Sequence, residues 1–154
     1  MEAKVSMTSE SHIPEGASIS VRLKISALWV AMLFLFAYGD IFGLFVPGRI
    51  DEIRGGKISG IEITQTFLLA ASVYVAIASL MIFLTLVLRP TVNRWTNIVL
   101  PILYIVSIIA SVIGESWVYF WFLSIAECAA LLLIIWYAWR WPTLDAGGRS
   151  GGLI

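Results

Sequence analysis

Residues 117–139 read WVYFWFLSIAECAALLLIIWYAW and contain one charged side chain, Glu127. At a rise of about 1.5 Å per residue, a helix of this length crosses the roughly 30 Å hydrocarbon layer of a bilayer. Tryptophan stands at both ends of the run, which is its usual interfacial position in membrane proteins. The stretch is therefore predicted to be a transmembrane helix.

Three further apolar runs are long enough to span a bilayer, and they cover about residues 25–46, 64–88 and 97–114. The sequence of 154 residues is 60% hydrophobic and only 13% charged, with a mean hydropathy of +0.93. A soluble domain carries roughly 25% charged residues. We therefore predict an all-α fold, an integral membrane four-helix transmembrane bundle, with no strand and no soluble domain.

The first run also raises the question of a cleaved signal peptide. Ala37-Tyr38-Gly39 loosely resembles a small-x-small cleavage site. The apolar run continues past this point to Val46, which is longer than the apolar part of a signal peptide. We therefore expect a retained helix.

The chain divides into a membrane domain, residues 22–142, between two polar tails. Residues 1–21 and 143–154 are rich in polar residues and glycine, and we predict that both tails are disordered. The glycine-rich loop of residues 47–63 carries charges of both signs. It predicts either a short interfacial helix that Gly55-Gly56 would end, or a solvated loop.

Arg89-Pro90 is predicted to end the second span and to begin a connector, RPTVNRWTN. Pro101 then falls in the first turns of the third span, where a missing N–H matters least. Glu115-Ser116 is predicted to form a very tight turn between the third and fourth spans.

Basic residues predict the orientation of the bundle, because cytoplasmic loops are enriched in lysine and arginine. Four spans place both termini on one side. That side holds Lys4, Arg22, Lys24, Arg89, Arg94, Arg140 and Arg149, and the other holds Arg49, Arg54 and Lys57. We therefore predict that both termini are cytoplasmic.

Several classes of function are excluded or disfavoured by composition. The one histidine, His12, lies in the N-terminal tail, and the one cysteine, Cys128, lies in the fourth span. Haem ligation by two histidines is therefore excluded, and we expect no metal site and no cofactor. No catalytic motif or phosphate-binding loop is present, so we expect no catalytic residues, and an enzyme is the less favoured class. Ten basic and ten acidic residues, with no basic patch, predict no nucleic-acid partner.

Two carboxyl groups within the spans are the candidate functional residues. Asp40 is predicted about 9 Å below the surface and Glu127 about 15 Å below it, both in the half of the bilayer away from the termini. Gly39 and Gly43 flank Asp40 and allow a neighbouring helix to approach closely. Stripes of small and hydroxyl-bearing residues predict the interior faces of the second and third spans: Ser72, Ala76, Ser79, Ser107, Ala110, Ser111 and Gly114.

These residues support two interpretations. In the first, Asp40, Ser124 and Glu127 form a polar pocket that binds a small ligand or a proton, and Tyr38, Tyr119 and Trp121 line its mouth. In the second, Glu127 is a neutral hydrogen-bond donor between helices, which contributes about 0.6–2 kcal/mol. Glu115 is interpreted as a surface residue.

A second candidate surface lies in the connector between the second and third spans. Arg89, Asn93, Arg94 and Trp95 suit contact with anionic headgroups or with a partner protein. Simple anchoring of the topology at the interface is the alternative. Lipid is in either case the expected partner of the spans.

Four stretches together resemble a known group of proteins: AYGDIFGLFVPG, NRWTNIVLPI, SIAECAALLLIIWYAW and YAWRWP. They are similar to a family of small bacterial four-span membrane proteins that carry only a domain-of-unknown-function label. The general layout is loosely similar to DoxX-like proteins. The resemblance covers about Leu23 to Pro142 and implies a bacterial inner-membrane helical bundle. It implies no reaction, ligand or catalytic residue.

Three functions stay open on the sequence. The first is a membrane protein that binds a small molecule or a proton through Asp40 and Glu127. The second is a structural or accessory subunit that packs against copies of itself or against a larger membrane partner. The third is a quinone-linked redox accessory, which the DoxX-like layout implies.

Overall fold

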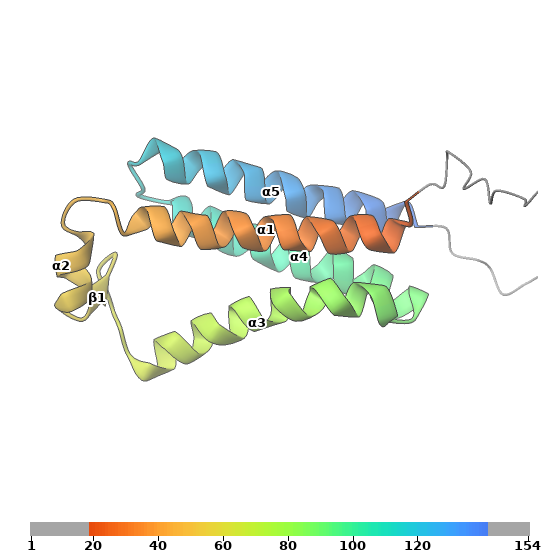
Figure 1. Ribbon diagram of the computed structural model, residues 1–154, viewed down its shortest axis with the longest axis horizontal. Helices are drawn as coiled ribbons and strands as arrows, with labels where there is room; N and C mark the ends of the chain where they lie inside the picture. The colour runs from red at the N-terminus through yellow and green to blue at the C-terminus, as the bar shows by residue number, and fades with distance from the viewer. Residues whose placement is uncertain (1–18, 142–154) are drawn as a thin grey trace, which may run out of the picture.

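The computed structural model contains four helices that are long and apolar enough to cross a membrane (Figure 1). The structure describes residues 19–141, so almost all of the two predicted tails lies outside the described residues. The spans are α1 (Val21–Gly43), α3 (Gln65–Val87), α4 (Pro90–Val112) and α5 (Val118–Trp139). The predicted all-α four-helix membrane bundle is confirmed.

The starts of three spans follow from their local sequence. The Ser20 hydroxyl accepts a hydrogen bond from the Leu23 N–H at 3.3 Å, and the Thr64 hydroxyl accepts one from Phe67 at 3.1 Å. Both are N-caps, which satisfy backbone donors that the first turn leaves free. Pro90 opens α4 at the position where a missing N–H costs nothing.

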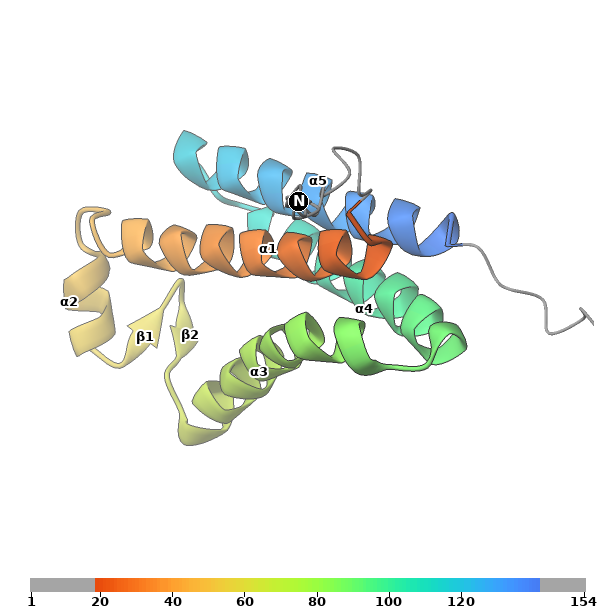
Figure 2. The same cartoon turned by 45° about the vertical axis from the view of Figure 1, so that its right-hand side comes forward.

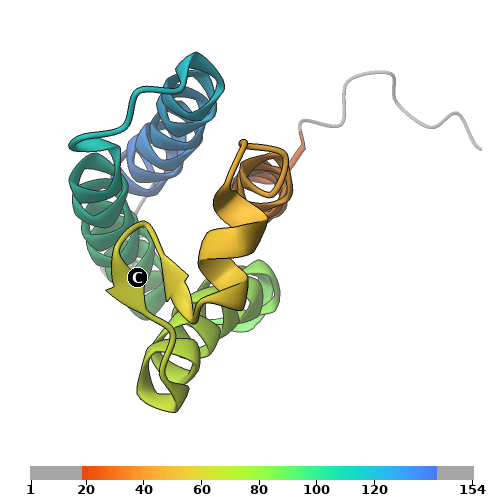
Figure 3. The same ribbon diagram turned by 90° about the vertical axis from the view of Figure 1, so that its left-hand side faces the viewer.

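The bundle has two distinct ends. The start of α1, the end of α5 and the short α3–α4 connection lie at one end, the terminal end (Figure 1). A segment between α1 and α3 lies at the other, the loop end. Viewed from the loop end, the helices follow the order α1, α5, α4, α3 around the bundle (Figure 3). α5 packs closely against α1 and α4, whereas α3 packs mainly against α1.

α3 lies close to the other spans at the terminal end and diverges from them toward the loop end (Figures 1 and 2). Its buried residues are Ala78, Met81 and Thr85, all in its second half. The stripe of Ser72, Ala76 and Ser79, predicted to face the interior, is exposed instead. The prediction was wrong because the first half of α3 diverges from the bundle and buries no residue, and the second half turns another face, that of Ala78, Met81 and Thr85, toward the core.

α4 begins at Pro90, earlier than the predicted start near Asn97, so most of the segment interpreted as a connector is helical. The apolar pattern misses this part because Asn93 and Asn97 are polar, yet both are fully buried. Pro101 therefore lies in the interior of the helix and not in its first turns. Its ring removes the hydrogen bond that the Asn97 carbonyl would otherwise accept.

The segment between α1 and α3 folds into the short helix α2 (Arg49–Arg54) and a hairpin of β1 (Lys57–Ile58) and β2 (Ile61–Glu62) (Figure 2). The helix is one of the two forms predicted, and it ends at Gly55 as expected. The hairpin was not predicted. Ser59 and Gly60 join its strands with φ of 48° and 79°, the pair of positive φ angles that a two-residue type I′ turn requires.

Arg49 holds this loop-end segment together. Its Nη1 donates to the Ser59 hydroxyl at 2.6 Å and to the Glu52 carboxylate at 3.2 Å. Glu52 also accepts a hydrogen bond from the Gly60 N–H at 2.9 Å. The helix and the hairpin are thus one hydrogen-bonded unit.

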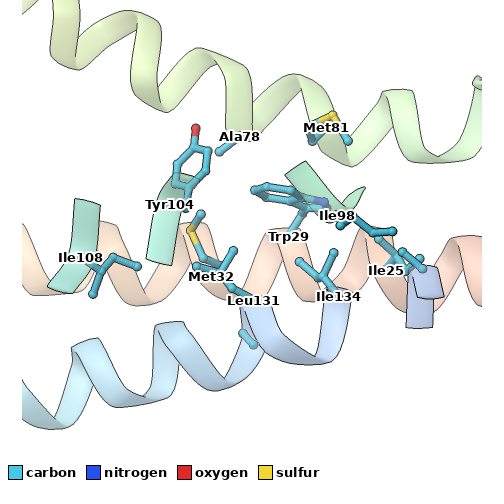
Figure 4. Packing of buried hydrophobic residues seen from close by; sticks show 12 residues of the cluster. Ile25, Trp29, Met32, Ala78, Met81, Ile98, Tyr104, Ile108, Leu131 and Ile134 are labelled. Atoms are coloured by element: carbon cyan, nitrogen blue, oxygen red, sulfur yellow. The ribbon is translucent and has the colours of Figure 1, made fainter. Parts of the chain in front are cut away.

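The apolar core lies toward the terminal end, around Trp29 of α1 (Figure 4). Met32 lies one turn further along α1, and Met81, Tyr104 and Leu131 bring in the other three spans. The Tyr104 ring meets the Trp29 ring edge-on, with centroids 5.7 Å apart. One tryptophan thus contributes to the packing of all four helices.

A buried polar network lies beside this core. The Asn97 side-chain oxygen accepts hydrogen bonds from Trp29 Nε1 at 2.8 Å and from the Thr85 hydroxyl at 3.3 Å. The Asn97 amide donates to the Asn93 side chain at 2.7 Å, and Asn93 donates to the Thr85 carbonyl at 2.6 Å. The network joins α1, α3 and α4 and satisfies the polar groups that it buries, as low-dielectric surroundings demand.

Candidate functional site

A cavity of about 460 Å³ lies among the four spans on the loop-end side of the core. Every span contributes to its wall. The lining residues are Phe36, Gly39, Asp40, Phe67, Ala70, Ala71, Tyr74, Ser107, Ile108, Ser111, Phe120, Leu123, Ser124 and Glu127. The volume falls within the range of roughly 300–1,000 Å³ that is typical of small-molecule sites.

Asp40 and Glu127 line this cavity from α1 and α5, two helices that run in opposite directions. Asp40 lies one turn before the end of α1, and Glu127 lies deeper, more than two turns into α5. Glu127 exposes only 6% of its surface, whereas Asp40 is more exposed. Within residues 19–141 neither carboxyl group forms a hydrogen bond or an ion pair. Glu127 is thus buried without a protein partner, which is costly for a charged group, and the exposed Asp40 lines the same space.

The glycines beside Asp40 allow α1 to lie close to α5. A Cβ atom at Gly39 would lie 3.7 Å from Leu123 Cδ1, and one at Gly43 would lie 3.6 Å from the Tyr119 hydroxyl oxygen. Both glycines therefore face α5, as the small-xxx-small pattern predicted. This close approach brings the Asp40 side of α1 next to the Glu127 side of α5.

Tyr74 lines the cavity and connects it, through Tyr104, to the core. The Tyr74 hydroxyl is 2.7 Å from the Ser107 hydroxyl, and the Tyr104 hydroxyl donates to the Tyr74 carbonyl. The two rings lie 4.3 Å apart, and Tyr104 in turn packs on Trp29. A continuous aromatic stack therefore connects the cavity to the buried network around Asn97.

The structure brings together three of the five predicted pocket residues: Asp40, Ser124 and Glu127. Tyr38 is 50% exposed and pairs with Phe42, outside the cavity. Tyr119 packs edge-on against Phe42 and does not line the cavity either. Trp121, also proposed for the mouth, lies on the other side of α5. Depth along the helix placed all three correctly near the loop end, but their faces were wrong.

The aromatic part of the lining was not predicted, and it consists of Phe36, Phe67, Tyr74 and Phe120. Helical spacing offered a signal for two of them. Phe36 lies four residues before Asp40, and Phe120 lies seven residues before Glu127, so each shares a face with its carboxyl group. The α3 residues had no such signal, because that helix contains no charged residue.

Glu115 has a local role at the loop end. One of its carboxylate oxygens accepts hydrogen bonds from the N–H groups of Ser116 at 2.8 Å and Trp117 at 3.1 Å. These donors belong to the connection that leads into α5. Glu115 thus lies outside the cavity and orders the turn.

The terminal end carries cations over aromatic rings. Arg22 lies over Trp141, Lys24 over Tyr137, Arg94 over Trp139 and Arg140 over Trp136, at 4.6–5.7 Å from the ring centroids. Arg94 Nε is buried and has no hydrogen-bond partner among the described residues. Arg89 and Trp95 are exposed.

Asn93 does not belong to this surface. It was grouped with Arg89, Arg94 and Trp95 as a headgroup contact, but its side chain is fully buried and hydrogen-bonded inside the bundle. A helical segment turns successive residues about 100° apart. Interpreting residues 89–97 as a connector concealed that Asn93 faces inward.

A second hollow, of about 570 Å³, lies between α4 and α5. Its wall is almost entirely apolar and includes Trp121, Ile125, Cys128 and Leu132. Ile108 and Ser124 line both this groove and the cavity, so they form part of the wall between the two.

The described residues contain no group of three or more His, Cys, Asp or Glu side chains that could hold a metal ion. The chemistry that the cavity offers is therefore that of two carboxyl groups, three hydroxyl-bearing serines and aromatic rings. Such a site can bind a polar or cationic molecule or exchange a proton.

Comparison with known proteins places the chain in a family without assigning a reaction. No curated protein and no solved structure matches the sequence significantly. Residues 19–146, which include all four spans, match a family of unknown function (DUF6326). The chain therefore belongs to this family of unknown function.

Proposed function

We propose that this multi-pass membrane protein binds a small ligand or a proton in the cavity, through Asp40 and Glu127. One observation carries the proposal: two carboxyl groups without hydrogen-bond partners in the described chain converge on one cavity that all four spans line. Ionisable groups inside a membrane are costly and usually serve binding or proton transfer.

The packing of Glu127 favours this function over a purely structural one. An acid that joins two helices donates its proton to a serine or a backbone carbonyl. Ser124 and Ser107 both line the same cavity, yet Ser107 bonds to Tyr74 and to the Tyr104 carbonyl instead. Among the described residues Glu127 thus forms no hydrogen bond between helices that its removal would break.

The stability of Glu127→Gln tests the proposal. Glutamine keeps the size of the side chain and removes its charge, and an unpartnered ionised group costs more free energy than a neutral one. We expect the variant to unfold at a higher temperature than the wild type in detergent. The difference should be larger at pH 8, where more of the carboxyl groups are ionised, and should reach about 1 kcal/mol or more.

Glu62→Gln is the matched control, because Glu62 lies exposed on β2 at the same end of the bundle. It should unfold like the wild type at both pH values. If Glu127→Gln were less stable than the wild type at both pH 5 and pH 8, Glu127 would be an interhelical hydrogen-bond donor. The proposal that the cavity binds a ligand or a proton would then lose its main support.

A structural or accessory subunit is the second candidate, and the exposed stripe on α3 favours it. Ser72, Ala76 and Ser79 lie on the outer surface of the span that the chain buries least. Stripes of small residues allow close packing of helices within membranes. A second copy of the chain or another membrane protein would pack there, and Ala76→Leu should release it when the complex is purified in native lipid discs.

For the orientation we infer that both termini are cytoplasmic, in the inner membrane of a bacterium. The described residues of the terminal end include Arg22, Lys24, Arg89, Arg94 and Arg140 and no acid, which agrees with the enrichment of basic residues on the cytoplasmic side. Arg89, Arg94 and Trp95 would then meet anionic headgroups. The cavity would lie in the outer half of the bilayer.

A further inference from the structure

We propose that the ligand of the cavity is an amphiphilic organic cation, with its charge beside Asp40 and Glu127 and its apolar groups against the surrounding aromatic rings. This inference rests on the proposed function and names the chemical class of the ligand. Charge, lining and size each contribute to the argument.

The charge of the lining selects against anions. Its acidic side chains are Asp40 and Glu127, and no lysine or arginine lines it. Arg49, the first basic residue after Asp40 in the sequence, is bonded to Glu52 and Ser59 in the loop-end segment. An anion would therefore meet two carboxyl groups without compensation, whereas a cation would satisfy both.

The aromatic lining selects for an organic cation over a bare metal ion. Phe36, Phe67, Tyr74 and Phe120 come from three helices and surround the space in front of the acids. Aromatic faces attract ammonium and other onium groups, and they also accept apolar substituents. A small hard cation needs six or more oxygen ligands at short range, and a cavity of about 460 Å³ is far larger than one such ion.

Binding of a cation should compete with protons. A buried carboxyl group without a charged partner is less costly in its neutral form, so a cation that binds beside the carboxylate releases a proton to solvent. The titratable groups that face Glu127 are Asp40 on α1 and Tyr74 on α3. Its chain neighbour Cys128 lines the α4–α5 groove, and Tyr119 lies near Asp40. α4 adds only the hydroxyl groups of Ser107 and Ser111. Of these groups the carboxyl groups are by nature the most acidic, so they are the ones that ionise first as the pH rises.

Equilibrium binding of tetraphenylphosphonium tests this inference on the full chain in lipid nanodiscs. Wild type should bind the probe more tightly at pH 8 than at pH 5. Glu127→Gln and Asp40→Asn should each weaken binding about tenfold or more, because a charged partner is lost. Ala71→Trp should also weaken binding, since it fills the cavity without changing its charge.

Two controls make the result specific. Glu62→Gln should bind like the wild type, and triphenylphosphine oxide, a neutral molecule of similar shape, should bind more weakly than the cation. The inference is overturned if the wild type does not bind the cation at pH 8, or if Glu127→Gln and Asp40→Asn bind it like the wild type. If Glu127→Gln is nevertheless more stable than the wild type, only the ligand class has failed and the proposed function stands.

Discussion

Asn97 is the residue on which the buried polar network depends. Its side-chain oxygen accepts two hydrogen bonds, from Trp29 and Thr85, and its amide donates to Asn93. The side chain is fully buried. Removing it leaves several buried donors and acceptors without partners, which costs more than the loss of a single hydrogen bond.

We expect Asn97→Ala to lower the free energy of unfolding by about 1–2 kcal/mol, since hydrogen bonds within membranes rarely exceed that range. The measurement is unfolding in mixed micelles with increasing SDS. Thr96→Ala serves as control, because the Thr96 hydroxyl bonds only to the Val92 carbonyl of its own helix. Equal stabilities for the two variants would show that the network contributes nothing.

At the residue scale, the sequence identified the important carboxyl groups within the spans but not the important buried amides. Asp40 and Glu127 could be found from their depth within apolar runs, because a charged side chain is costly inside a membrane and usually serves a function. Asn93 and Asn97 stand between Arg89 and the apolar part of α4, where polar residues are ordinary at an interface. Their burial depends on the packing of three helices, which no local pattern contains.

Among the elements, α1 and α5 form the contact that positions the two carboxyl groups. Gly39 faces Leu123 at an ordinary contact distance, so a methyl group at this position meets no clash. A larger side chain would separate the helices and move Asp40 away from Glu127.

We therefore expect Gly39→Ala to be tolerated, with a change of less than about 1 kcal/mol, because it also favours the helix. Gly39→Leu should cost about 2 kcal/mol through overpacking. Both are measured by the same SDS titration. The comparison is Ala37→Leu, which adds a similar side chain on the exposed face of α1, and an equal loss there would mean that Gly39 has no special place in the α1–α5 contact.

The helices and strands show which features a local sequence pattern predicts and which it does not. Apolar length predicted four spans and glycines predicted the end of α2, since both signals are local. The face of α3 was predicted wrongly, because small residues suit the interior of a bundle only where helices approach closely. The hairpin was missed because its two strands are very short and its turn, Ser59-Gly60, lacks the stronger Asn-Gly signal.

On the scale of the whole molecule, charge divides the two ends. Among the described residues every acid lies in the loop-end half, and the terminal end carries basic residues alone. A bilayer with an anionic cytoplasmic surface favours one orientation of such a molecule.

Cysteine labelling tests this orientation. In a Cys128→Ala background, Lys57→Cys at the loop end should react with a membrane-impermeant maleimide in right-side-out vesicles. Thr91→Cys at the terminal end should react only after the vesicles are opened with detergent, because the proposed orientation places it inside. The reverse pattern would invert the orientation, and labelling of both in closed vesicles would indicate that the chain inserts in two directions.

The attachment of α3 has a mechanical consequence. Its second half is tied to α1 by hydrogen bonds from Arg22 to the Leu86 carbonyl and from Ser26 to the Ile82 carbonyl, and its first half buries no residue. That first half behaves as a rod roughly 17 Å long, so a tilt of about 10° displaces its free end by about 3 Å. The width of the cavity is thus set by the angle of one helix, and the lateral pressure and thickness of the surrounding bilayer act directly on that angle.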